Sequence, residues 1–171
     1  MNNQLTYSKG TLYVQNNVRV AGVLSFTPPA LTNTVGTRRT TWMDAPVSVD
    51  TGMEAMQVDF KVNADKDVLG LFGFAEQRRV RAYIHRTFKG LNENDLRLYV
   101  DEVEGLISNI TPDEHGADGQ ESVGYAITMN VNYYKQTIDD DVFYEIDPVN
   151  MIRIIAGVDT LEKERKLLGL G

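Results

Sequence analysis

Residues 123–133 alternate strictly between apolar and small or polar side chains, and this pattern constrains the fold more than any other feature of the chain. Successive side chains of a β-strand point to opposite faces, so the pattern predicts a strand with one buried face and one small, polar face. Residues 54–62 and 79–88 alternate in the same way. Such strands are typical of antiparallel sheets with one solvated face. We therefore predict a mainly β protein, an antiparallel β-sandwich or barrel.

The alternation also assigns side chains to faces. On residues 123–133 the apolar face comprises Val123, Tyr125, Ile127, Met129, Val131 and Tyr133. The opposite face comprises Gly124, Ala126, Thr128, Asn130 and Asn132. On residues 54–62 the polar face comprises Gln57, Asp59 and Lys61. These polar faces are the candidates for a solvated wall of the protein.

Local signals add a hairpin, a bulge and two helices. Gln15-Asn16-Asn17 predicts a tight turn between strands at residues 12–14 and 18–26, because asparagine tolerates positive φ. The alternation of residues 96–110 changes phase at 101–103, which predicts a bulge or bend. Helix signals occur at 63–73 and at 159–168, where Asp159 and Glu162 have the spacing of a capping box. We predict that both short helices flank and pack on the sheet.

Two segments show no periodicity. Residues 27–50 contain three prolines and the only tryptophan, and unstructured loops longer than about 15 residues are usually functional or disordered. Residues 111–122 have the composition of a mobile connection between strands. No repeat or linker divides the chain, so we predict a single domain over residues 1–171, large enough to fold without disulfides.

The formal net charge is −7 and there is no cysteine. Nucleic-acid binding depends on Lys and Arg neutralising phosphates, so this balance argues against it. An acidic surface can nevertheless let DNA slide past without holding it, and the same charge also simply keeps a protein soluble. Because we find no secretory signal and no run of 18 apolar residues, we expect a soluble protein in the cytoplasm when it is made.

No catalytic, cofactor-binding or metal-binding motif is found. His85 and His115 belong to no hydrolase or zinc motif. The three aspartates at 139–141 lack the spacing of a calcium loop, so a solvated turn is the favoured interpretation. Gly70 and Gly73 match neither phosphate-binding glycine pattern. We predict no enzyme, no cofactor and no metal.

Basic residues cluster on and beside the strand predicted at 79–88. They are Arg78, Arg79, Arg81, Arg86 and Lys89, and Tyr83 and Phe88 lie among them. Basic and aromatic side chains together can bind single-stranded nucleic acid. They can also pair with an acidic neighbouring subunit, which is the alternative that we favour in so acidic a chain.

The later part of the chain runs from Tyr-Tyr-Lys-Gln-Thr-Ile at 133–138 through the acidic turn at 139–141 to Glu-Ile-Asp-Pro-Val-Asn-Met-Ile-Arg at 145–153. The order of these segments resembles the major tail tube proteins of contractile-tailed bacteriophages. Earlier pieces are similar to the same family, namely Val-Leu-Ser-Phe-Thr-Pro-Pro-Ala-Leu-Thr at 23–32 and Met-Asp-Ala-Pro-Val-Ser-Val-Asp-Thr-Gly-Met-Glu at 43–54. These matches are collinear across nearly the whole chain.

The resemblance implies a structural protein of the virion, assembled in the host cytoplasm. Members of the family form hexameric rings that stack into a tube inside a contractile sheath, and each subunit would lend strands to a continuous β-barrel around the bore. The implied partners are other copies of the chain, the sheath protein, the tape measure protein, and the baseplate hub and tail terminator proteins. Viral DNA would pass through the lumen without sequence-specific binding, and no membrane is involved.

In such a tube the small polar faces would line the lumen. The expected lumen residues are Gln57, Asp59, Lys61, Thr128, Asn130 and Asn132. The loop at 27–50 would contact the next ring through Arg38, Arg39, Trp42 and Met43, because arginine and aromatic side chains are typical interface anchors.

Two alternatives remain open. The inner tube of a bacteriocin-like particle or of a type VI secretion system shares the fold. A monomeric β-barrel that binds a small ligand would also alternate and be acidic, but it requires an enclosed apolar pocket rather than polar-faced strands and a long loop.

Overall fold

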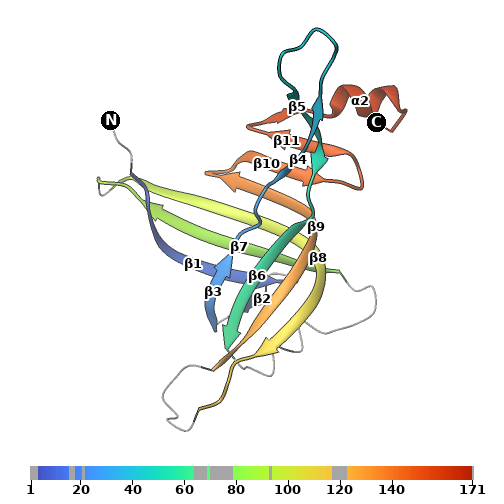
Figure 1. The fold of residues 1–171 in the computed structure, drawn as a ribbon. Coiled ribbons are helices and arrows are strands. Elements are labelled where there is room, and N and C mark those ends of the chain that lie inside the picture. Colours follow the sequence, from blue (N-terminus) through green and yellow to red (C-terminus); the bar gives the residue numbers. More distant parts are fainter. Residues whose placement is uncertain are drawn as a thin grey trace.

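The computed structural model describes residues 4–15, 18–20, 22–63, 69, 79–92, 94–116 and 123–170. The protein is mainly β, with 65% strand and 5% helix, and its sheets are antiparallel, which confirms this part of the predicted fold class. Figure 1 shows a strongly curved sheet, a long hairpin that projects from it, and a short C-terminal helix near the base of the hairpin.

The described part of the chain contains strands that are all joined by antiparallel pairing. They are β1 (Thr6–Val14), β2 (Val18–Val20), β3 (Val23–Thr27), β4 (Asn33–Arg38), β5 (Val47–Met53), β6 (Met56–Asn63), β7 (Val80–Lys89), β8 (Leu96–Pro112), β9 (Gly124–Ile138), β10 (Asp141–Asp147), β11 (Ile152–Ile155) and β12 (Val158–Asp159). The helix α2 (Glu162–Leu167) follows β12.

Ten of the strands form one sheet. Its main path runs β12-β11-β10-β9-β8-β7-β1-β2, while β6 also pairs with β9, and β3 pairs with β6. The predicted first hairpin is confirmed, because Val14 of β1 stands opposite Val18 of β2. The segment predicted as one strand at 18–26 is divided, since β2 pairs with β1 whereas β3 pairs with β6.

Alternation places the core on one face of the sheet. In β6, Met56, Val58, Phe60 and Val62 are buried, and the residues between them are exposed or half-buried. The buried side chains of β9 follow the prediction from Ile127 to Val131, but then Tyr134 rather than Tyr133 is buried. The reason is a bulge, because Gly105 pairs with Val131 and Glu104 pairs with Tyr133, which leaves Asn132 as an extra residue in β9.

The bulge predicted at 101–103 lies elsewhere. Besides the irregularity at Asn132, a second one leaves Ser108 as the extra residue of β8. Asp101 and Val103 both face the core, and Asp101 is 0% exposed. The alternation therefore continues unbroken through this stretch, and it seemed to change phase only because a carboxylate occupies a core position.

Asp101 is stabilised in the core by a polar network. Its Oδ2 lies 2.5 Å from a guanidinium nitrogen of Arg86, and its Oδ1 accepts hydrogen bonds from Tyr134 Oη and Gln136 Nε2, both at 2.9 Å. Burial and the neighbouring carboxylate raise the pKa of Tyr134, so its hydroxyl remains a donor. Because a buried charge is tolerated only when it is paired and hydrogen-bonded, this network ties β7, β8 and β9 together.

The sheet curls but does not close into a barrel. β1 and β3 approach each other across the opening, and a Cβ at Gly10 of β1 would lie 2.9 Å from the ring of Phe26 in β3. This contact leaves no room for a larger residue at position 10. The predicted continuous barrel around a bore would thus require neighbouring copies.

The helix predicted at 159–168 is present as α2. However, Asp159 belongs to β12, and the N-cap position is Leu161, which has no side-chain cap. The capping-box assignment is therefore wrong. Asp159 instead accepts the amide N–H of Leu161 and pairs with Arg165 at 2.8 Å. The helix does not pack closely on the sheet either, since it buries none of its residues.

Two other predictions fall largely outside the described residues. Of the helix predicted at 63–73, residues 64–68 and 70–73 lie outside the described ranges, and so do residues 117–122 of the connection predicted at 111–122. Thr111 and Pro112 belong to the end of β8. No helix within the described ranges has the length and apolarity needed to cross a bilayer.

Candidate functional site

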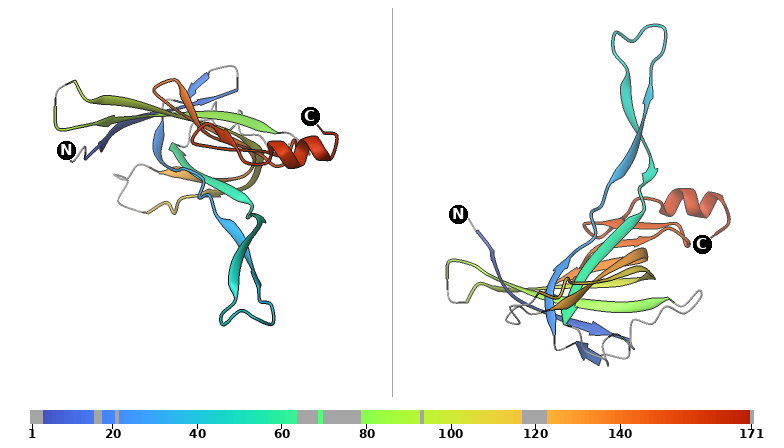
Figure 2. Two further views of the ribbon diagram at one scale, coloured as in Figure 1. Left: turned by 90° about the horizontal axis from the view of Figure 1, so that it is seen from above. Right: turned by 60° about the horizontal axis from the view of Figure 1, so that its bottom comes forward.

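The segment expected to be an unstructured loop is a β-hairpin. β4 and β5 pair from Asn33 opposite Met53 to Arg38 opposite Val47, and the hairpin stands away from the sheet (Figures 1 and 2). Its strands are exposed along most of both faces. A strand without a buried face shows no alternation, which is why residues 27–50 carried no periodic signal.

All four residues predicted to contact a neighbouring ring lie at the tip of this hairpin. Arg38 ends β4, and residues 39–46 form the turn. The turn is shaped by Met43, whose backbone N–H donates to the carbonyl of Thr40 at 3.2 Å and whose carbonyl accepts from Arg39 Nε at 3.3 Å. Trp42 is 82% exposed. The tip therefore presents a large aromatic side chain beside two arginines.

A buried arginine attaches the base of the hairpin to the sheet. Arg153 of β11 donates from one guanidinium nitrogen to Asn33 Oδ1 at 2.9 Å and to Asp50 Oδ2 at 2.6 Å, and its side chain is only 11% exposed. Arg153 and the amide of Gly52 hold the pKa of Asp50 below its ordinary value of 3.8. The clamp joins two strands of the hairpin to a strand more than a hundred residues later.

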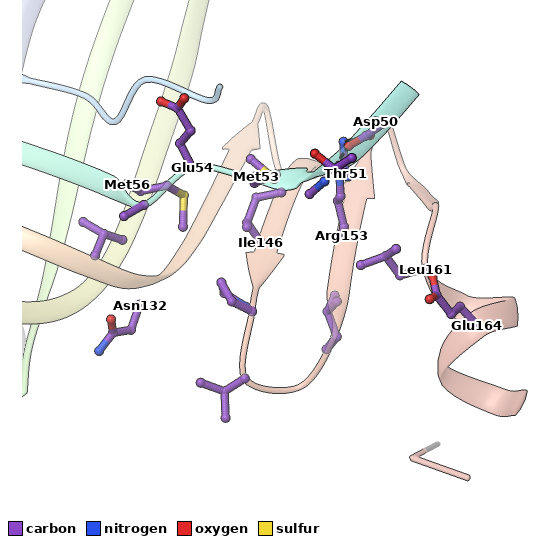
Figure 3. A pocket seen from close by; sticks show the side chains of 16 residues that line it. Asp50, Thr51, Met53, Glu54, Met56, Asn132, Ile146, Arg153, Leu161 and Glu164 are labelled. Atoms are coloured by element: carbon purple, nitrogen blue, oxygen red, sulfur yellow. Dashed lines mark hydrogen bonds and ion pairs between the residues drawn. The ribbon is translucent and has the colours of Figure 1, made fainter. Parts of the chain in front are cut away.

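A groove of about 760 Å³ lies between the base of the hairpin, β10, β11 and the start of α2 (Figure 3). Its apolar lining includes Met53, Met56, Ile146, Val149, Ile152 and Leu161. Its charged lining comprises Asp50, Glu54, Arg153 and Glu164, so carboxylates outnumber cations. In Figure 3, Glu54 and Glu164 stand on opposite sides of the groove.

Five of the six residues predicted for the lumen share one face of two paired strands. Gln57 stands opposite Asn130, Asp59 opposite Thr128, and Lys61 opposite Ala126. Thr128 donates to Asp59 at 2.8 Å, and the Gln57 amide donates to the same carboxylate at 3.2 Å. The structure thus assembles one continuous polar surface on β6 and β9, on the side away from the core.

The single cation of this polar surface is already neutralised. Lys61 Nζ lies 2.8 Å from Asp113 Oδ2. That contact and the amide N–H of Gly124 hold the pKa of Asp113 below its ordinary value. The surface consequently offers no unpaired ammonium group to an approaching anion.

Asn132, the sixth predicted lumen residue, is set apart from the other five. It is the extra residue of the bulge in β9, one position beyond Val131, the partner of the first residue of β6. Its side chain lines the groove at the hairpin base (Figure 3). We therefore separate it from the polar surface of β6 and β9.

Three arginines of the basic cluster in and beside β7 form ion pairs within the subunit. Arg81 donates a hydrogen bond from Nε to the carboxylate of Glu104, and its Nη1 lies 3.3 Å from Oε1 of Glu102. Nη1 of Arg79 lies 3.9 Å from Oε1 of Glu104. Arg86 is committed to the buried Asp101. The facing strand β8 supplies acids at matching positions, so these three arginines have partners within the subunit, and pairing with a neighbouring subunit stays a prediction.

The described residues contain no group of three or more side chains that could hold a metal ion. Asp139 and Asp140 both have positive φ and form the turn between β9 and β10, as the solvated-turn interpretation predicts. The Asp139 carboxylate accepts the amide N–H of Leu98 and pairs with Arg97 at 2.6 Å. It is therefore a structural turn residue.

Sequence reasoning missed the clamp and the groove. Arg153 could have been noticed as a lone charge within a short apolar strand, since such a charge is usually paired. Nothing in the sequence indicated that its partners are Asn33 and Asp50. The groove combines residues 50–56, 131–132, 146–153 and 161–164, which only the fold brings together.

Comparison with known families gives one informative match. The model of the family described as phage tail tube protein FII matches residues 7–169, which is nearly the whole chain. No curated protein matches this chain.

Proposed function

The chain belongs to the phage tail tube protein FII family, and from that premise we propose that it builds the inner tube of a contractile tail as stacked hexameric rings. The family is structural, which supports a role as a tail component of the virion. Assembly in the host cytoplasm, enclosure by a sheath, and contacts with the tape measure, baseplate hub and tail terminator proteins belong to the same proposal.

The observation that carries the proposal is the polar surface of β6 and β9. A sheet whose one face is core and whose other face is exposed, small and polar is suited to be the wall of an aqueous channel. We assign Gln57, Asp59, Lys61, Thr128 and Asn130 to the lumen. Asn132 lies at the border of this wall.

The open edges of the sheet support ring formation. Within the described residues, β3 pairs only with β6, and β2 pairs only with β1, so each leaves one edge free. An unpaired edge is a template for a strand of another chain. Pairing between neighbouring subunits would cover these edges and continue the curved sheet around the bore.

Charge supports passage of DNA without retention. A protein holds DNA by neutralising phosphates with Lys and Arg, but Lys61 is paired with Asp113 and the whole chain has net charge −7. A wall of this kind repels a polyanion weakly and does not trap it.

The lumen assignment is tested by the paired substitutions Thr128→Lys and Asn130→Lys. They would add two cations per subunit to the wall, of which Asp59, the hydrogen-bond partner of Thr128, could neutralise only one, and we expect delivery of DNA to be lost or strongly reduced in tubes that still form. The matched control, Thr128→Gln with Asn130→Gln, adds length without charge and should deliver DNA normally. Unchanged delivery by the lysine variant would refute the lumen assignment.

The tube itself is tested by electron microscopy and solution mass of the concentrated protein. Rings or smooth hollow tubes are expected.

For the hairpin, we propose that its tip contacts the next ring, so deletion of residues 36–42 should leave a folded subunit that does not elongate. Normal tubes from this deletion would refute the stacking role.

A further inference from the structure

The tip of the hairpin carries binding groups that its own subunit does not use. Trp42 is 82% exposed, and such exposure is unusual for tryptophan, whose side chain is the largest of the apolar ones. Within the described ranges, no carboxylate forms an ion pair with Arg38 or Arg39. Aromatic and arginine side chains together are typical of interface anchors.

The groove at the hairpin base has the complementary chemistry. It is lined by apolar side chains of β5, β10 and β11, and its exposed carboxylates Glu54 and Glu164 form no ion pair with the cations of the described residues. Val149, at 72% exposure, leaves apolar surface open to solvent there. A basic tip with an aromatic anchor therefore matches an acidic groove with an apolar lining.

The hairpin is long enough to join two copies. The chain from Asn33 to Trp42 can span about 30 Å at roughly 3.3 Å per residue. Figures 1 and 2 show the hairpin projecting beyond the rest of the sheet. A second copy stacked on the first in the same orientation would thus bring the base of its own hairpin to the level of the first copy's tip.

We propose that the hairpin tip of each subunit docks into the groove at the hairpin base of a subunit in the next ring. Trp42 inserts among the apolar side chains, and Arg38 pairs with the acidic residues at the groove. The contact joins two different surfaces, so it leaves a free tip and a free groove at the ends of every stack and can repeat without limit. This inference rests on the proposed stacking and names the surface that receives the tip.

Disulfide trapping tests the contact directly, because the chain contains no cysteine. Thr41→Cys places a thiol beside the intact Trp42, and Val149→Cys places one at the groove. The matched control combines Thr41→Cys with Val158→Cys, another exposed valine of the C-terminal segment that does not line the groove. A disulfide requires Cα atoms within about 7 Å, so only true neighbours should be trapped.

Oxidised tubes of the Thr41→Cys, Val149→Cys variant should give a ladder of covalent multimers on non-reducing gels, and the control pair should stay monomeric. A ladder from the control pair alone, or none from either pair in tubes seen by microscopy, would overturn the groove assignment and leave stacking intact. If the wild-type chain forms no tubes or rings even within its complete particle, the proposed function fails and this inference fails with it.

Charge reversal gives an independent test. Arg38→Glu and Glu164→Arg should each abolish tube growth at concentrations where the wild-type chain assembles, and the two together should restore it. Circular dichroism of the unassembled subunits would show whether each variant folds. Normal growth of both single variants would contradict the proposed pairing.

Discussion

Replacing Asp101 by asparagine tests how strongly the sheet depends on its buried carboxylate. Asp101 is fully buried, and its partner Arg86 retains only 14% exposure and lies over the rings of Phe88 and Tyr99 at 5.7 Å. The substitution keeps the shape of the side chain but removes its charge. Arg86 would then remain as a nearly buried cation without a counter-charge.

The expected loss is about 4 kcal/mol, because breaking a buried ion pair from one side costs about 3–5 kcal/mol. The hydrogen bonds from Tyr134 and Gln136 to a charged acceptor also weaken, but they share the same carboxylate and are not counted separately. With a urea m value of about 2 kcal/mol/M, the midpoint of unfolding should fall by about 2 M. Urea titration of the unassembled subunit at neutral pH, followed by circular dichroism, measures this shift.

A double variant separates the charge from the packing. Asp101→Leu combined with Arg86→Leu removes both charges, so it should be more stable than Asp101→Asn, since apolar replacement of a whole buried pair is often neutral or favourable. A midpoint shift below about 0.5 M for Asp101→Asn would refute the reasoning, because it would mean that Arg86 finds solvent or another partner at little cost.

Three further outcomes follow from the fold. Gly105→Ala should prevent stable folding, because the Cβ of the alanine would lie 2.0 Å from a backbone oxygen of β9. Its control, Gly116→Ala, has open space around the added Cβ and should unfold at the urea midpoint of the wild-type chain. Asp140→Gly should raise stability by about 1 kcal/mol in urea titration, because Asp140 has a φ of 72° that glycine adopts freely. The pKa of Asp50 is lowered by Arg153, so the clamp is complete above the ordinary value of 3.8 and is lost as pH falls through the lower folded value. The anisotropy of the single tryptophan should therefore stay constant from about pH 6 to about pH 4 and drop only as pH falls further below 3.8, whereas Arg153→Ala should show the low value throughout.

The sequence predicted the parts of the fold in which local pattern reports burial. β6 and β9 alternate because one face of each is core, and five of the six residues predicted for the lumen do lie side by side, Asn132 being the exception. The pairing of β6 with β9 could not be read from the pattern, because it joins residues about seventy positions apart and alternation specifies no partner.

The failures have equally physical causes. The hairpin of β4 and β5 was missed because neither of its faces is buried in the subunit, so no periodicity is imposed on its sequence. The bulge predicted at 101–103 is absent there because Asp101, although charged, is a core residue. Arg86, Tyr134 and Gln136 supply the ion pair and hydrogen bonds that its buried carboxylate requires. Asp159 had the spacing of a helix cap but was engaged by Arg165 and by the amide of Leu161.

The exposed apolar residues follow from the same reasoning. Trp42, Val149, Val158 and Leu167 are 65–89% exposed and lie in the hairpin or the C-terminal segment. Leu91, at 81%, lies between β7 and β8, so all five stand outside the strands with clear alternation. Folding of one subunit does not bury them, so the hydrophobic effect within the monomer gives no reason for their apolar character. Burial between subunits would supply that reason, since apolar patches on a solvated surface usually mark interaction sites. In a family of tube proteins, the segments that break the alternation are therefore the first place to look for the contacts that build the tube.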